Sequence, residues 1–146
     1  MKIMPPTYFV VLLIMSISLH FFLPVLQFSY FPFNYFGFVF IILGIVLNLW
    51  ADSVFKKKNT TVKPNELPNV FIADGPFRFS RNPMYLGMFA ILLGSGIFLG
   101  SLISFITPLV FVILIEVIFI PTEEQGMEKE FGSNYLKYKK KVRRWL

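Results

Sequence analysis

The sequence predicts an all-α integral membrane protein: four transmembrane helices, the last two forming a hairpin, and a C-terminal amphipathic helix in the cytoplasm. Hydrophobic residues make up 55% of the 146 residues, and the mean hydropathy is +0.66. These residues gather in four blocks, and crossing a bilayer takes about 20 apolar residues, with a lower limit of about 17. A chain of this length forms one domain and cannot hide four such blocks in a soluble core.

The four blocks predict where the spans lie. They cover about residues 8–26, 35–51, 84–99 and 102–120. The third block is the shortest, and a bilayer can thin locally to match it. An uncharged turn, Gly100-Ser101, joins the last two blocks, so these two are expected to form the hairpin.

The distribution of basic residues predicts the topology. All fourteen Lys and Arg lie in three places: Lys2, residues 56–81 and residues 129–144. Because cytoplasmic loops carry an excess of Lys and Arg, both termini and the long loop 52–83 are expected in the cytoplasm. The net charge of +6 then faces anionic lipid headgroups. No groove-reading module accompanies these residues, so no nucleic-acid partner is expected.

Small and polar residues inside the first two spans are expected to pack helices together. His20 has no second ligand nearby, whereas zinc needs three or four, so no metal site is predicted. The chain has no Cys, which excludes thiolate chemistry. Gly37 and Gly44 share a face suited to close helix packing. Asn48 can hydrogen-bond either a neighbouring helix or a ligand.

The loop 52–83 leads into the third span through two turn signals. Asp74-Gly75-Pro76 is a tight-turn sequence. Pro83 suits the first turn of a helix, where its missing N–H costs nothing. Within the span, Gly87, Gly94 and Gly96, together with Ala90, predict a small-residue surface for close contact.

Glu116 is an ionisable residue within the fourth span. A charge in a bilayer is costly, so such a residue is a functional candidate by default. Three interpretations stay open: Glu116 acts on a substrate, it pairs with Arg78 or Arg81, or it extends to the interface.

The segment after Pro121 predicts a separate cytoplasmic helix over residues 122–146. Thr122-Glu123-Glu124-Gln125 has the pattern of a capping box at a helix start. Apolar residues then recur at three- and four-residue steps, opposite a face rich in Lys and Arg. Such an amphipathic helix can lie on an anionic membrane surface or over the ends of the spans.

Arg81 is expected to meet Glu123 and Glu124. Arg81 precedes the third span and the two acids follow the fourth, so the hairpin returns them to one membrane face. An ordinary ion pair accounts for this arrangement, and so does a pocket for a zwitterionic, positively charged cofactor.

Four motifs in this part of the chain follow one another in a set order: Gly75-Pro76-Phe77-Arg78, Arg81-Asn82-Pro83-Met84-Tyr85-Leu86-Gly87, Glu123-Glu124 and residues 131–138. They resemble the G-P-Y-R…R-H-P-x-Y-x-G and E-E…F-G-x-x-Y-x-x-Y signature of the isoprenylcysteine carboxyl methyltransferase and phospholipid methyltransferase superfamily. The resemblance covers about residues 37–146. Asn82 stands where His is usual in the isoprenylcysteine branch, whereas N-P-M-Y is like the phospholipid methyltransferases.

This resemblance implies a membrane enzyme that uses S-adenosyl-L-methionine at the cytosolic face without a Rossmann domain. It implies a cofactor pocket lined by Arg81, Asn82, Pro83, Tyr85, Glu123 and Glu124. An Arg can grip the methionyl carboxylate bidentately, and a Glu can hold the amino group or ribose hydroxyls. The expected acceptor is small or lipophilic: an isoprenylcysteine-like carboxylate, a lipid amine or a thiol. For an amine or thiol, Glu116 is the candidate catalytic base.

Two other functions fit parts of the pattern. Sterol-type membrane reductases that use NADPH have a comparable motif, H-P-N-Y-x-G-E, but here Met84 replaces the Asn and Met88 follows Gly87. A non-enzymatic membrane binding or scaffold protein that kept the pocket would bind cofactor without turnover.

Overall fold

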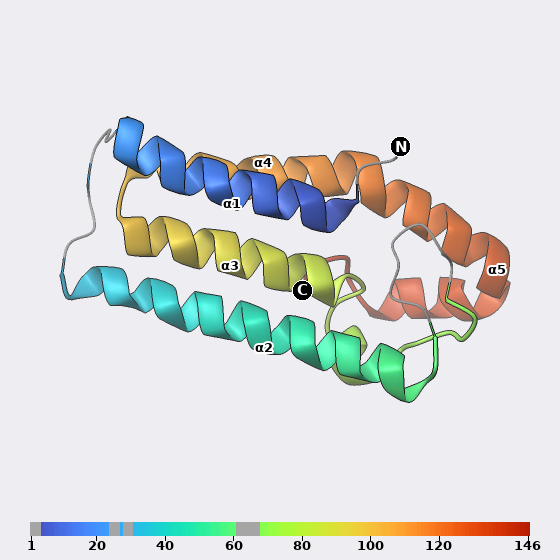
Figure 1. Ribbon diagram of the computed structural model, residues 1–146. Coiled ribbons are helices and arrows are strands. Elements are labelled where there is room, and N and C mark those ends of the chain that lie inside the picture. The colour runs from blue at the N-terminus through green and yellow to red at the C-terminus, as the bar shows by residue number, and fades with distance from the viewer. Residues whose placement is uncertain (1–3, 24–26, 28–30, 61–67) are drawn as a thin grey trace.

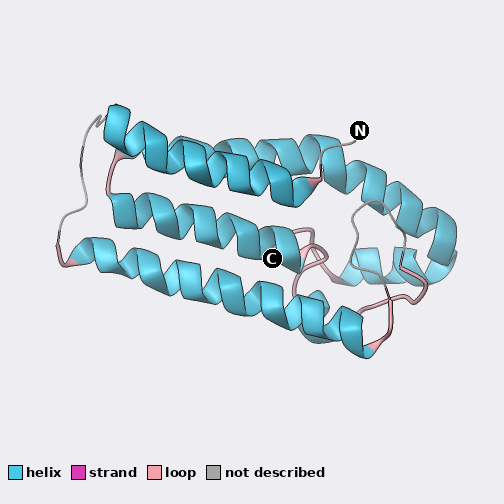
Figure 2. Ribbon diagram, viewed as in Figure 1, coloured by secondary structure: helices cyan, strands magenta, loops and turns pink. Residues whose placement is uncertain are grey.

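Helices run side by side through most of the protein in the computed structural model, which describes residues 4–23, 27, 31–60 and 68–146 (Figure 1). The helices are α1 (Pro5–Phe22), α2 (Phe36–Lys57), α3 (Pro83–Leu99), α4 (Ile106–Leu114) and α5 (Ile120–Lys141). No strand occurs among the described residues (Figure 2). Lys2, the predicted end of the first span at 24–26 and loop residues 61–67 lie outside the described part.

Apolar helices long enough to cross a membrane confirm the predicted fold class. Three segments meet this length: Pro5–Phe22, Phe33–Lys57 and Leu102–Lys141. The apolar helix Pro83–Leu99 has 17 residues, close to the lower limit for a span. The turn at Gly100, which has a left-handed backbone, joins α3 to the following helix as the predicted hairpin.

Glycine contacts hold α2 against α3, the most extensive helix–helix contact of the described chain. A Cβ atom on Gly44 would lie 2.5 Å from the carbonyl oxygen of Gly87. One on Gly94 would lie 2.5 Å from the carbonyl oxygen of Gly37. The two backbones therefore touch at two levels, which confirms the predicted close packing of Gly37, Gly44, Gly87 and Gly94, whereas Gly96 lies nearest Ser104.

The other side of α3 packs against α1 and α4. Leu92 of α3, Phe111 of α4 and Ile115 are fully buried in one cluster with Leu12 of α1. The buried Ser16 hydroxyl donates to the carbonyl oxygen of Ser104 over 3.4 Å. Thus α3 is central in the bundle, and its first turn is enclosed by neighbouring elements.

The structure differs from expectation after the fourth span, because the helix does not restart at Thr122. A π-helical turn, Ile115–Phe119, joins α4 to α5, and Thr122 donates to the carbonyl of Ile118 within the helix. A proline inside a helix lacks an N–H and crowds the carbonyl four residues earlier. The wider turn directly before Pro121 accommodates both effects, so the capping-box interpretation is wrong.

The tail also ends differently from the predicted helix 122–146. Within α5, Gly132 has φ 50° and ψ −123°, a backbone conformation that residues with a Cβ rarely adopt. The chain kinks there and folds back toward the bundle (Figure 1). The helix ends at Lys141, and Val142 is extended. The tail lies over the helix ends, which is one of its two predicted placements.

The second helix is longer than predicted and shortens the loop 52–83. It continues past Ala51 to Lys57, with Asp52 and Lys56 paired one turn apart at 2.6 Å. The short helix Gly75–Arg78 then packs Phe77 against Ala51. This places the segment before α3 against the end of α2.

Candidate functional site

The candidate site lies at the end of the bundle where α3 begins. Residues 142–146 run back to this point and bind the segment that precedes α3 (Figure 1). The Arg81 backbone N–H donates to the carbonyl of Arg143 over 2.9 Å. The Asn82 side-chain amide donates to the carbonyl of Arg144 over 3.2 Å. The C-terminal residues are therefore part of the site.

Glu124 is the centre of an ionic cluster. It is only 6% exposed, and Arg144 binds both of its oxygens: Nε to Oε1 at 2.9 Å and Nη2 to Oε2 at 3.0 Å. Arg81 Nη1 lies 2.8 Å from Oε1, and Lys139 Nζ lies 3.3 Å from Oε2. A carboxylate removed from water needs such partners. The structure thus brings Arg81 and Glu124 together, as expected.

Glu123 points to a different partner, although it is the neighbour of Glu124. Its Oε1 accepts a hydrogen bond from the hydroxyl of Tyr85, in the first turn of α3. Successive residues of a helix point about 100° apart, which follows from 3.6 residues per turn. One acid therefore faces α3, while the other faces the arginines.

Asn82 and Pro83 shape the start of α3. Pro83 is the first residue of the helix and is fully buried. The Asn82 backbone N–H donates to the Ser80 hydroxyl over 3.1 Å, and that hydroxyl donates to the carbonyl of Arg144 over 3.0 Å. Hydrogen bonds thus hold the segment that carries Arg81 internally and also connect it to the C-terminal residues.

Glu116 pairs with an arginine, but not with Arg78 or Arg81. Its Oε1 accepts from Arg144 Nη1, and its Oε2 accepts from Trp145 Nε1 over 3.0 Å. Glu116 lies in the π-helical turn, and such turns are frequent at functional sites. Both carboxylate oxygens are engaged, so this geometry favours the ion-pair interpretation over that of a free base.

Arg144, Trp145 and Lys139 are site residues that sequence reasoning did not select. Arg144 bridges Glu116 and Glu124, and the hydrogen bonds that it donates to Glu124 and, to a smaller extent, to Glu116 raise the pKa of Arg144 above its ordinary value. The sequence interpretation placed Arg144 on the outward basic face of a helix. Its one signal in the sequence is the Arg144-Trp145-Leu146 ending, which follows the superfamily motifs.

Aromatic residues brace the folded-back part of α5 over the loop. The ring of Phe71 lies 5.4 Å from that of Tyr138 and 6.3 Å from that of Tyr135, both edge-on. The Tyr138 hydroxyl donates to the carbonyl of Phe77 over 2.6 Å. These contacts hold Lys139 and the C-terminal residues in place.

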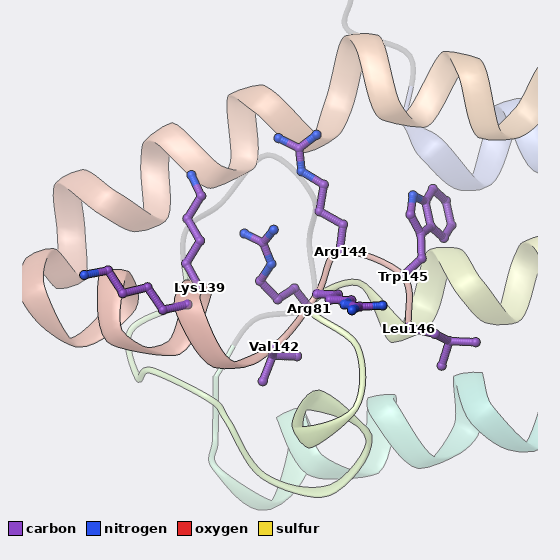
Figure 3. A pocket seen from close by; sticks show the side chains of 8 residues that line it. Arg81, Lys139, Val142, Arg144, Trp145 and Leu146 are labelled. Atoms are coloured by element: carbon purple, nitrogen blue, oxygen red, sulfur yellow. The ribbon is translucent and has the colours of Figure 1, made fainter.

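A cavity of about 400 Å³ adjoins the ionic cluster. It is lined by Arg81, Lys139, Lys140, Val142, Arg143, Arg144, Trp145 and Leu146. The side chains of Arg81, Lys139 and Arg144 point to the same side, toward α5, whereas those of Val142 and Leu146 point away from it (Figure 3). The lining therefore combines five cationic side chains with those of Val142, Trp145 and Leu146.

The Arg81 guanidinium has N–H donors that make no hydrogen bond. Its side chain is 10% exposed, yet Nε and Nη1 have no hydrogen-bond partner in the described part of the chain. The Nη1 contact with Glu124 is close enough for an ion pair but lacks hydrogen-bond geometry. Buried donors without partners are costly, so the site fits a ligand that brings an anionic group, such as the carboxylate of S-adenosylmethionine. No group of three or more potential metal ligands occurs among the described residues.

Comparisons with known proteins bear on this site. A family model, PEMT or phospholipid methyltransferase, matches residues 33–134. An uncharacterized protein of Haemophilus influenzae is 40% identical over 63 residues, which are 43% of this chain and the whole of that protein. The protein-S-isoprenylcysteine O-methyltransferase of Schizosaccharomyces pombe is 34% identical over 77 residues, 51% of this chain and 31% of that enzyme. No solved structure gives a significant match.

Proposed function

The chain belongs to the phospholipid methyltransferase family, and from this premise we propose that it transfers the methyl group of S-adenosyl-L-methionine to a small or lipophilic acceptor at the cytoplasmic face of a membrane. Membership of this family favours a methyltransferase over the NADPH-dependent reductase. Since the chain spans less than a third of the length of the fission-yeast enzyme, the acceptor of that enzyme is not carried over.

One observation supports this proposal above the others: Arg81 is nearly buried, lines a cavity, and has an Nε with no partner and an Nη1 with no directed hydrogen bond. A guanidinium in this state recognises a carboxylate in a planar, two-bond geometry. Arg81 would therefore bind and orient the carboxylate of the cofactor's methionyl group. Bound S-adenosylmethionine supplies an activated methyl group, so much of the catalysis can come from positioning.

The two neighbouring acids, Glu124 beside Arg81 and Glu123 beside Tyr85, would complete the proposed pocket. Glu123 retains acceptor capacity beyond its bond to Tyr85 and would hold the cofactor's amino group or ribose hydroxyls. Glu124 sets the position of Arg81 through their 2.8 Å contact. Asn82 and Pro83 fix the segment that carries Arg81 at the start of α3. A positively charged sulfonium would be stabilised by the nearby carboxylates and by aromatic faces.

The acceptor would approach from the bilayer between helices, which favours a lipophilic molecule: an isoprenylcysteine-like carboxylate, a lipid amine or a thiol. A carboxylate needs no base, whereas an amine or thiol must first lose a proton. Glu116 could serve as that base only if Arg144 and Trp145 release one of its oxygens.

Turnover of radiolabelled S-adenosylmethionine tests this function. The purified protein in detergent is incubated with each acceptor class, and label in the acceptor is counted. We expect transfer to one class and little transfer with Arg81→Ala. Cofactor binding without transfer to any acceptor would support the binding or scaffold alternative, and absence of binding would refute the proposed pocket.

A further inference from the structure

We propose that Arg144 is a positioning residue of this site: it takes up the carboxylate of Glu124 so that Arg81 keeps its donors open for the anionic group of the ligand. The inference rests on the proposed function and adds to it a role for the C-terminal segment 142–146. That segment carries none of the residues that the sequence analysis selected as site residues.

The first step is the geometry of Glu124. Arg144 donates to both carboxylate oxygens, at 2.9 and 3.0 Å, in the paired arrangement that Arg and carboxylates favour. Lys139 adds a contact at 3.3 Å. Glu124 is thus satisfied by residues from α5 and the C-terminal segment.

The second step concerns Arg81, which faces the same carboxylate from the other side. Arg81 Nη1 approaches Oε1, the oxygen that already accepts from Arg144 Nε, to 2.8 Å and makes no directed hydrogen bond with it. Its Nε has no hydrogen-bond partner, and its Nη1 has only this ion-pair contact, although the side chain is 10% exposed. Without Arg144, Glu124 would be free to accept the paired hydrogen bonds from Arg81 and close its donors to a ligand.

The third step is how the segment is held. Trp145 and Arg144 bind opposite oxygens of Glu116, and the carbonyl of Arg144 accepts from Asn82 and Ser80. Together with the hydrogen bond from the Arg81 backbone N–H to the carbonyl of Arg143, these contacts anchor the segment on both sides of Arg144. The backbone of Arg144 is therefore fixed, and its guanidinium reaches Glu124 from a defined position, as a positioning role requires.

Binding of two ligands that differ in one group tests the inference. S-adenosylmethionine carries the carboxylate, and decarboxylated S-adenosylmethionine lacks it while keeping the amino and sulfonium groups. Calorimetry on the full chain in detergent should show Arg144→Ala weakening S-adenosylmethionine binding about tenfold, one charge-assisted contact, with little effect on the decarboxylated ligand. Arg144→Lys keeps the charge but not the paired geometry and should restore binding only in part.

Two further variants separate positioning from a general structural effect. Lys141→Ala removes one positive charge from the neighbouring helix end and should leave both affinities unchanged. In an Arg81→Ala background, Arg144→Ala should add no further loss, because the two residues act through one contact.

Tighter binding by Arg144→Ala would show that Arg144 blocks the site, and equal losses for both ligands would show a structural role; either result overturns the inference. If the unaltered protein binds neither ligand, the proposed function fails, and this inference fails with it.

Discussion

Replacing Glu124 by Gln probes the ionic cluster at the centre of the site. The side chain is 6% exposed and holds Arg144 through two hydrogen bonds, with Arg81 and Lys139 within 3.3 Å. The neutral amide leaves the three cations facing one another with no anion between them. Removing one member of a buried ion pair costs about 3–5 kcal/mol.

This cost can be measured as a fall in the melting temperature of the protein in detergent. For a chain of this size, 1 kcal/mol corresponds to roughly 2–4 °C, so Glu124→Gln should melt about 6–20 °C lower. The matched control is Glu128→Gln, since Glu128 pairs with Lys139 while both side chains are 35% exposed. An ion pair exposed to this degree stabilises the protein by about 1 kcal/mol or less. Equal melting temperatures for the two variants would refute the buried cluster.

Three other predictions concern packing, Glu116 and topology. Gly44→Ala should destabilise the protein by about 1–2 kcal/mol net, because the added Cβ meets the α3 backbone at 2.5 Å. The control is Gly96→Ala, whose Cβ would have its nearest atom at 3.4 Å and which should be nearly neutral in thermal unfolding. Equal effects of the two substitutions would contradict the close contact between α2 and α3. Glu116→Gln should lower the melting temperature by weakening its bond to the C-terminal segment, while cofactor affinity falls less than in an Arg81 variant; unchanged stability with lost turnover would instead make it a catalytic base. Cysteines introduced at Asn59 and Ser133 should resist labelling from outside intact cells, and labelling of either would contradict a cytoplasmic loop and tail.

The sequence predicts the helical layout well, because the signals are local. Apolar blocks of span length and glycines spaced on one face need only the helix period to be interpreted, and Gly37, Gly44, Gly87 and Gly94 do form the α2–α3 contact. The meeting of Arg81 with Glu124 follows from hairpin connectivity and charge. These features require no knowledge of where the tail goes.

The course of the tail could not be predicted from such signals. The Thr122 capping pattern is present, but the helix continues through it because the π-helical turn accommodates Pro121. The basic face of the predicted helix 122–146 includes Arg144, yet the helix ends at Lys141 and the extended backbone turns Arg144 toward Glu124. Contacts between residues far apart in the sequence determine both the continuous helix and the course of the tail. A periodic pattern of apolar residues does not reveal such contacts.

Binding of S-adenosylhomocysteine, the product form of the cofactor, is the most direct test of the central claim that Arg81 recognises the cofactor's carboxylate. Calorimetry on the purified protein in detergent should detect binding that weakens at least about tenfold in Arg81→Ala, the loss of one charge-assisted contact. The melting temperature of the variant should be recorded beside it to confirm that it is folded. Undiminished binding by folded Arg81→Ala would contradict the account.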